Sequence, residues 1–333
     1  MAVMLGHDTL AGVLGMRDAI DLLECALQHE AAGRTSVSPK FVTHFDTGSM
    51  RMLFAADHDA GYCATKAYHT IQGTGTRYVV SLYRLADGEL LALLDGQLIT
   101  DLRTGAASGV IARKVHLDGP VSVGIIGSGH QASMQLESLA CVYPIRSAAV
   151  YSPTEAHRVA YACSMSAKLG IDVVPVASAE AAVRGRDVVA TASGSRSKEP
   201  VVRGAWLESC RLLCAVGNTR AYAAEADIEC FRSTRLTVVD GVHALDEAGE
   251  LRAAVECGVV TPANHTTLAQ VVAGNVALPA DGRITFKSVG TALQDLALAA
   301  RYYELLGGKA SCTEPQLASL RRPVWERFAH GDA

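Results

Sequence analysis

Short apolar runs that alternate with helix-favouring segments mark the middle of the chain. The first run, at 121–126, leads into a glycine-containing turn, and a segment of helical character follows at 130–141. Five further apolar runs lie at 147–151, 173–176, 187–192, 212–216 and 236–240. Alanine-rich segments of helical character separate several of these runs, such as 154–169 and 178–185. Strands that alternate with helices are typical of a parallel, doubly wound sheet, so residues 118–290 are predicted to form one Rossmann-type domain.

The first 117 residues have a different pattern. A helical segment at 16–32 precedes stretches with turn signals, and the segments 76–85 and 90–94 have the β-branched and aromatic character of strands around a short turn. This pattern predicts an antiparallel α+β domain. The helical segment near the end, 292–306, has no strand partner of its own, and we expect it to fold back on the first domain. The predicted fold class is α/β, with the Rossmann-type domain at 118–290 inserted in an α+β domain of residues 1–117 and 291–333.

The turn after the first apolar run has the pattern G-x-G-x-x-A. Its residues are Gly127, Ser128, Gly129, His130, Gln131 and Ala132. The first glycine permits a tight turn, the second lacks the Cβ that would hold the backbone away from a phosphate, and the alanine allows close packing of helix and strand. The following helix would direct its free N–H groups at a pyrophosphate. The pattern therefore predicts a dinucleotide site, the alternative being a glycine-rich loop of another α/β protein.

Composition and charge narrow the classes of partner. The chain has 333 residues, 49% of them hydrophobic, and a net charge of -4, which gives no reason to expect nucleic acid or an anionic membrane as partner. No apolar run approaches the length of a membrane span and no leader pattern opens the chain, so we expect a cytoplasmic protein. The nine cysteines are scattered without a C-x-x-C pair, which predicts neither disulfides nor a metal site.

Three segments, taken together, resemble the ornithine cyclodeaminase and mu-crystallin family. They lie at 91–108, 127–132 and 288–297, in the family's order and approximate spacing, and the resemblance spans nearly the whole chain. It implies a homodimer in which a substrate-binding and dimerisation domain (1–117 with 291–333) is joined to a Rossmann domain. It also implies that NAD(P) and a small amino or imino acid meet in the cleft, where a hydride interconverts C=N and CH–N.

The resemblance carries over three candidate residues. Arg103 matches the arginine that grips the substrate carboxylate, and Lys66 matches the lysine beside the reacting carbon, where it can bind the carboxylate or move a proton. Asp227 falls where the family tends to place an acid near the substrate amine. Helix capping is the alternative role for Asp227, and Glu225 and Glu229 are then the other candidates for the acid.

Arg51 departs from the ornithine cyclodeaminase pattern, which carries a glutamate near this point. A cation there should repel the side-chain ammonium of ornithine or lysine. If Lys40, His44 and His69 in neighbouring segments also face the substrate, the pocket would suit a second carboxylate, as in iminosuccinate.

The choice of cofactor depends on the end of the second strand. Ser152 stands where an NAD site usually has an acidic residue, and Thr154, His157 or Arg158 could contact the 2′-phosphate of NADP. Glu155 argues for NAD, so NAD and NADP both remain open, with the pattern favouring NADP. The other residues expected to contact the cofactor are Thr104, Ala192, Ser193, Val216, Gly290 and Thr291.

The sequence thus predicts an NAD(P)H-dependent oxidoreductase that reduces the C=N bond of a small α-imino acid to an L-amino acid, or the reverse. The α-imino acid could be dicarboxylic. An ornithine- or lysine-type cyclodeaminase is the alternative within the enzyme class. A nucleotide-bound binding protein without turnover is the alternative outside it.

Overall fold

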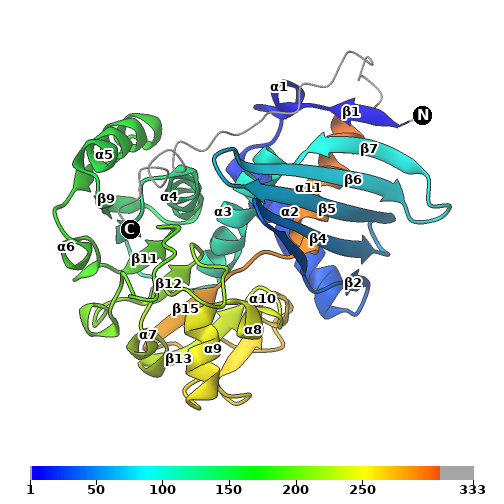
Figure 1. Ribbon diagram of the computed structural model, residues 1–333. Coiled ribbons are helices and arrows are strands. Elements are labelled where there is room, and N and C mark those ends of the chain that lie inside the picture. Colours follow the sequence, from blue (N-terminus) through cyan, green and yellow to red (C-terminus); the bar gives the residue numbers. More distant parts are fainter. Residues whose placement is uncertain (1, 308–333) are drawn as a thin grey trace. The chain divides into compact units, whose positions relative to one another are not determined.

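A sheet of seven strands forms the centre of the first of two units in this computed structural model, which describes residues 2–307 (Figure 1). Of the described residues, unit 1 comprises 2–103 and 291–307. Its strands are β1 (Val3–Leu5), β2 (Thr35–Val37), β3 (Phe41–Phe45), β4 (Gly48–Asp57), β5 (Tyr62–Ile71), β6 (Gly75–Arg84) and β7 (Leu90–Asp95). The order is β1-β7-β6-β5-β4-β2, with β3 also paired to β4; β1 pairs with β7 in parallel and the other pairs are antiparallel.

Helices α2 (Met16–Ala31) and α11 (Ala292–Leu306) pack against this sheet (Figure 1), and a short α1 (His7–Leu10) precedes them. In α2 the buried residues include Met16, Ile20, Leu23 and Leu27, a spacing of three and four that forms one apolar face. Helix α11 packs on β4 and β5, as expected for a segment that folds back on the first domain.

Helix α3 (Gly96–Lys114) begins directly after β7 and continues into unit 2, which comprises Thr104–Gly290. The predicted Rossmann domain started at 118, whereas packing divides the chain within α3. The cause is the attachment of α3 to α4 (His130–Val142): Gln135 donates to the carbonyl of Thr104 at 3.1 Å, and Ser138 donates to that of Gly105 at 2.7 Å.

Unit 2 is a parallel sheet of eight strands in the order β10-β9-β8-β11-β12-β15-β13-β14. The strands are β8 (Val121–Ile126), β9 (Ile145–Tyr151), β10 (Val173–Pro175), β11 (Val188–Thr191), β12 (Leu212–Ala215), β13 (Thr234–Val239), β14 (His265–Thr267) and β15 (Arg283–Lys287). The further helices are α5 (Glu155–Leu169), α6 (Ala179–Val183), α7 (Ile228–Arg232), α8 (Ala244–Glu247), α9 (Gly249–Glu256) and α10 (Leu268–Val272), with a 3₁₀ turn at Gly204–Trp206. Every pair of neighbouring strands is parallel, which confirms the Rossmann-type fold class.

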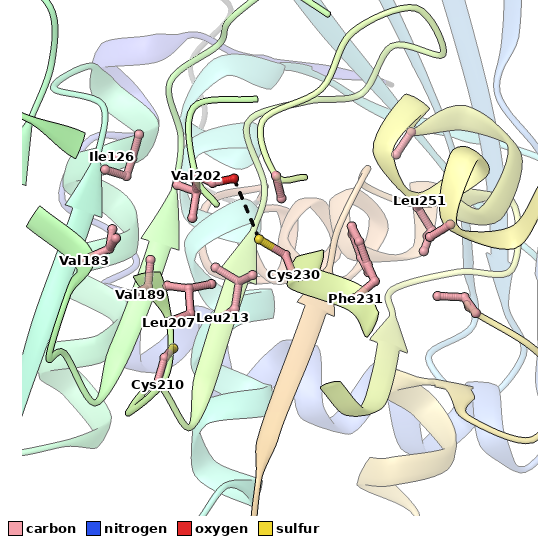
Figure 2. Packing of buried hydrophobic residues seen from close by; sticks show 14 of the residues in the cluster. Ile126, Val183, Val189, Val202, Leu207, Cys210, Leu213, Cys230, Phe231 and Leu251 are labelled. Atoms are coloured by element: carbon pink, nitrogen blue, oxygen red, sulfur yellow. Dashed lines mark hydrogen bonds between the residues drawn. The ribbon is translucent and has the colours of Figure 1, made fainter. Parts of the chain in front are cut away.

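The core between this sheet and its helices is apolar and includes buried thiols (Figure 2). Val189 and Leu213 lie on central strands, while Phe231 comes from α7 and Leu251 from α9. The Cys230 thiol lies 3.8 Å from the Val202 carbonyl, to which it donates. This packing anchors α7 and α9 against the sheet through apolar contacts.

The described residues were compared with the requirements of a metal site and of a membrane span. Among residues 2–307, no three histidine, cysteine or acidic side chains are grouped so as to hold a metal ion, and no helix there is long and apolar enough to cross a membrane. The eight cysteines of this range are free thiols, and Cys312 lies outside it. Burial raises the pKa of the Cys210 and Cys214 thiols to about 12.

Candidate active site and cofactor site

A buried lysine is the centre of the candidate active site in unit 1. Lys66 lies in the middle of β5, and its side chain is only 2% exposed. The ammonium Nζ donates to Asp295 Oδ1 at 2.6 Å and to Thr100 Oγ1 at 2.7 Å. Thr100 in turn donates to the Gly96 carbonyl at 2.5 Å. The lysine is therefore fixed by three elements of unit 1: strand β5 and helices α3 and α11.

The surroundings of Lys66 change its acidity. Burial lowers the pKa of the ammonium from 10.5 to about 8. The negative charge of Asp295 opposes this shift, whereas the positive charges of Arg103 and Lys40 lower the pKa further. An amine with a pKa near 8 gains and loses a proton readily close to neutral pH, as a general acid or base must.

Arg103 lies on α3 beside the same carboxylate. Its Nε is 3.5 Å from Asp295 Oδ1, and its Nη1 donates to Gln294 Oε1 at 3.3 Å. The structure shows no other acceptor for this guanidinium among the described residues, so most of its five N–H donors face no protein partner. A largely buried guanidinium of this kind can bind a carboxylate through two parallel hydrogen bonds.

Two tyrosines and Arg51 extend the site along β4, β5 and β6. Tyr68 and Tyr78 are paired across strands with ring centres 5.1 Å apart, and Lys66 Nζ lies 5.1 Å from the centre of the Tyr78 ring. The Arg51 guanidinium lies 5.7 Å from the centre of the Tyr68 ring and donates to Ser49 Oγ at 2.7 Å. Tyr68 is two residues from Lys66 and hence on the same face of β5. Arg51 therefore belongs to the same surface as Lys66.

The other cations predicted for this surface separate into two groups. The charge of Lys40 reaches Lys66, as its effect on the lysine pKa shows. His44 on β3 and His69 on β5 have exposed side chains instead. The structure thus brings Lys40 and Arg51 toward Lys66 and leaves both histidines exposed.

The glycine turn of unit 2 has the geometry of a phosphate-binding turn. Gly127 has φ +114°, and a Cβ there would lie 2.4 Å from the Ala192 carbonyl oxygen, so only glycine fits. Gly129 precedes the first residue of α4, and a Cβ on it would meet no protein atom within 4 Å. The protein itself does not require glycine at 129, whereas a pyrophosphate lying against the backbone would. The turn therefore fits a dinucleotide at the N-terminus of α4.

The end of β9 presents hydroxyl and guanidinium groups. Ser152 is buried and accepts a hydrogen bond from Ser128 of the glycine turn at 2.9 Å. Arg158 Nη1 donates to the Ser152 carbonyl at 3.2 Å, and the Glu155 side chain is 80% exposed, 3.9 Å from the Arg158 guanidinium. Thr154 is the N-cap of α5. A serine with an arginine next to it thus occupies the place of the usual acid.

Most of the other predicted cofactor residues follow neighbouring strands. Because β8, β11, β12 and β15 are adjacent and parallel, the segments after them share one edge of the sheet with the glycine turn. The residues at this edge are Ala192, Ser193, Val216 and Gly290. Two predicted residues lie on helices instead, namely Thr104 in α3 and Thr291 at the N-cap of α11.

A second buried ion pair supports the loop after β12. Lys287, the last residue of β15, is fully buried, and its ammonium lies 2.8 Å from a Glu250 carboxylate oxygen. The same ammonium donates to the Asn218 carbonyl at 2.6 Å, and the Asn218 amide donates to the Ala223 carbonyl at 2.6 Å. These bonds hold the loop in one conformation next to the predicted cofactor residue Val216.

The acidic residues proposed for the substrate amine have structural partners. Asp227 is the N-cap of α7, where its Oδ1 accepts from the amides of Cys230 at 3.1 Å and Gly204 at 2.9 Å. This geometry is that of the helix-capping alternative. Glu225 is fully buried and accepts from Thr191 Oγ1 at 3.0 Å, as well as from both the amide and the hydroxyl of Ser193. Exposed Glu229 pairs with Arg232 at 2.8 Å.

The sequence analysis does not single out Asp295, the acid that contacts Lys66. It lies inside the segment 288–297 that carries the family resemblance, but nothing in the sequence connects it to Lys66, 229 residues earlier in the chain. Only the packing of α11 on β5 brings the two together.

A sequence profile of the ornithine cyclodeaminase/mu-crystallin family matches residues 2–310. The chain belongs to this family. An alanine dehydrogenase from Archaeoglobus fulgidus is 32% identical over 311 residues, which are 91% of this chain and 94% of that protein.

Solved structures of family members share the fold. The Δ1-pyrroline-2-carboxylate reductase of Thermococcus litoralis in complex with NADH and L-proline matches with a TM-score of 0.86 and 28% identity, over 93% of this chain and 99% of the other. An archaeal alanine dehydrogenase dimer with bound NAD matches with a TM-score of 0.85 and 28% identity, over 93% and 98%. Family membership confirms the prediction of an oxidoreductase of amino acid metabolism.

Proposed function

We propose that this chain is an NAD(P)H-dependent oxidoreductase that reduces the C=N bond of a small α-imino acid to an L-amino acid, or runs the reverse reaction. The observation that carries the proposal is the buried Lys66–Asp295 pair with the largely unpaired Arg103 guanidinium beside it. The first offers a proton near neutral pH and the second offers a carboxylate-binding group. The activities of the relatives, alanine dehydrogenation and Δ1-pyrroline-2-carboxylate reduction, support this class of chemistry.

The roles follow from the contacts. Arg103 binds the α-carboxylate through two N–H donors and so fixes the orientation of the imine. Lys66, held by Asp295 and Thr100, donates the proton that the imine nitrogen gains, and Asp295 stabilises the ammonium before transfer. The nicotinamide, when bound, supplies or accepts the hydride. The residues for its pyrophosphate are those of the turn at 127–132, and those for its adenosine ribose lie at the end of β9.

The function is tested by oxidation of NADH and NADPH with ammonia and a panel of 2-oxo acids and cyclic imines. Turnover of any of these compounds supports the proposal. Release of ammonia from ornithine without net change in nicotinamide absorbance would instead show the cyclodeaminase reaction, and inactivity toward every compound would favour the binding-protein alternative.

For the cofactor we propose NADP(H). Its support is the end of β9, where Ser152 replaces an acid and Arg158 lies against the Ser152 carbonyl. The family members cited bind NADH or NAD, so the preference of this chain is open to a direct test.

Introducing an acid at this point should reverse the cofactor preference. In Ser152→Asp, repulsion between carboxylate and 2′-phosphate should lower kcat/KM for NADPH by about 100-fold while that for NADH changes less, a cost of about 2.7 kcal/mol. Steady-state kinetics with both cofactors measure this. Glu155→Gln, a change of an exposed side chain, is the matched control and should leave the ratio unchanged. A wild-type enzyme that prefers NADH would contradict the NADP proposal.

For the substrate we propose a dicarboxylic imino acid of the iminosuccinate type. Four cations, Lys66, Arg103, Arg51 and Lys40, act on one surface that contains the carboxylate of Asp295. A second carboxylate would compensate the excess positive charge and could bind Arg51. The same charge disfavours the ammonium side chains of ornithine and lysine.

Arg51→Met should therefore lower activity toward a dicarboxylic substrate much more than activity toward a monocarboxylic one. Loss of a charged hydrogen bond costs about 2 kcal/mol, so kcat/KM with oxaloacetate and ammonia should fall about 30-fold. With pyruvate and ammonia, which offer only one carboxylate, the value should stay within about threefold. Equal losses on both substrates would exclude a second-carboxylate role for Arg51 and leave the hydride chemistry untouched.

We also propose that the protein acts as a homodimer. Every side chain of β3 is exposed, including the apolar Phe41, Val42 and Phe45, and Phe41 forms an edge-on ring contact with exposed Phe54. Such a surface is typical of protein interfaces, and the archaeal relative is a dimer. Light scattering measures the molar mass and so tests the homodimer directly.

The free buried thiols Cys210, Cys214 and Cys230 support a reducing, cytoplasmic location.

A further inference from the structure

A second reactive arrangement lies in unit 1, on α2 and at the end of β4. Cys25 and His29 are one helical turn apart on α2, and Cys25 Sγ lies 3.7 Å from His29 Nε2. The other ring nitrogen, His29 Nδ1, lies 2.9 Å from Asp57 Oδ2. Cys25 is exposed, the His29 side chain is 25% exposed, and that of Asp57 is 4% exposed. Thiol, imidazole and carboxylate thus follow one another from the surface inward.

The carboxylate is fixed, and it decides the role of the imidazole. Asp57 Oδ1 accepts from the amides of Asp59 and Ala60, both at 3.0 Å, so the turn after β4 holds the side chain in place. Because Asp57 is a hydrogen-bond acceptor, His29 Nδ1 carries the hydrogen of that contact. In the neutral ring His29 Nε2 is then the basic nitrogen, and it faces the Cys25 thiol.

A thiol, a base and a group that orients the base are the parts of an activated sulfur nucleophile. We infer that Cys25 is a thiol-modification site that takes a small disulfide, such as oxidised glutathione, and forms a mixed disulfide. The inference does not depend on the proposed hydride chemistry, since none of its residues belongs to the Lys66 site.

The reaction is a thiol–disulfide exchange. His29 Nε2 takes the proton of the Cys25 thiol, and Sγ attacks one sulfur of the incoming disulfide. The bond between the two incoming sulfurs breaks as the new bond to Sγ forms. The departing thiolate leaves as a thiol after taking the proton from His29. Cys25 is oxidised, and half of the incoming disulfide is reduced.

The chain supplies its own comparison thiols. Cys163 on α5 and Cys257 after α9 are also exposed. In residues 2–307 the structure shows no histidine in contact with either sulfur. Exposure alone predicts equal reactivity for the three thiols, whereas the arrangement at Cys25 predicts faster reaction there.

The test is the rate of mixed-disulfide formation with oxidised glutathione near neutral pH, followed by peptide mass spectrometry of the full-length protein. We expect Cys25 to react at least about tenfold faster than Cys163 or Cys257. His29→Gln should reduce the rate at Cys25 to that of the other two thiols. Cys163→Ser and Cys257→Ser should leave the rate at Cys25 unchanged.

Asp57→Asn is the second variant, because it removes the group that orients the imidazole. It should also slow the reaction at Cys25, and circular dichroism tests whether both variants are folded. A Cys25 that reacts no faster than Cys163 and Cys257, or that keeps its rate in folded His29→Gln, would overturn the inference.

Discussion

Lys66→Met should lower kcat by about a thousandfold, which is the scale of a lost proton donor in the transition state. Methionine keeps the length and burial of the side chain but cannot donate to Asp295 or to a substrate. Binding of NADP(H), measured by fluorescence titration, should be retained, since the residues proposed for its pyrophosphate and adenosine ribose lie in unit 2. Lys168→Met removes an exposed ammonium that pairs with Glu137, and it is the matched control with wild-type activity expected.

The loss of activity in Lys66→Met could come from a less stable protein or from the missing proton donor, and two measurements distinguish these causes. Removing Lys66 leaves the buried Asp295 with Arg103 as its remaining cation, so some loss of stability is expected. Thermal unfolding measures that loss. If folded Lys66→Met protein with bound cofactor turns over within about tenfold of wild type, Lys66 is not the proton donor.

The pH dependence follows from the direction of the shift. Burial lowers the pKa of Lys66 to about 8, so the ammonium is protonated below that pH and neutral above it. Imine reduction needs the proton, and its kcat/KM should be level below about pH 8 and fall above it. Amine oxidation needs the free base and should show the opposite limb. Between pH 8 and 10.5 the unfolded lysine binds more protons than the folded one, so this group makes the fold more stable as pH rises through that window.

Arg103→Lys should raise KM for the imino acid about 50-fold with a smaller change in kcat. The ammonium keeps the charge but loses the planar pair of donors, and a lost charged hydrogen bond costs about 2 to 3 kcal/mol. Arg103→Gln should be more severe because the charge is lost as well. Steady-state kinetics with varied imino acid test both changes.

The same variants probe the coupling to Lys66. Because the charge of Arg103 lowers the pKa of Lys66, Arg103→Gln should move the pH profile upward, whereas Arg103→Lys should move it little. Arg301→Gln, at an exposed arginine that pairs with Glu304, is the control for loss of a guanidinium. An unchanged KM in Arg103→Gln would show that the carboxylate binds elsewhere.

Local patterns predict the units of this fold well where the pattern is contiguous. The apolar run before Gly127 and the turn itself identify β8 and α4, because the whole pattern, including the glycine that the turn requires, lies in consecutive residues. Strand β15 was missed, since charged Arg283 and Lys287 stand at its two ends and interrupt the apolar run. Its place between β12 and β13 is a matter of tertiary pairing, which no local pattern contains.

The site residues likewise divide into those that local sequence segments predict and those that depend on tertiary packing. Lys66 and Arg103 follow from a resemblance in segments, and their roles remain predictions. Asp295 required the packing of α11 on β5, and the capping contacts of Asp227 required the position of Gly204. Contacts between residues far apart in the chain are invisible to any rule that considers neighbouring residues.

The path of the chain between the two units restricts how the protein can be made. Unit 1 contains β5 with Lys66, early in the chain, and α11 with Asp295, which follows residue 291. The sheet of unit 2 gains β15 only with residues 283–287. During synthesis, therefore, neither unit can be completed until roughly nine-tenths of the described chain has left the ribosome. Until then the face of β4 and β5 on which α11 packs lacks that helix, which makes the nascent chain dependent on protection from aggregation. Fragments that end before α11 should for the same reason require a chaperone to remain in solution.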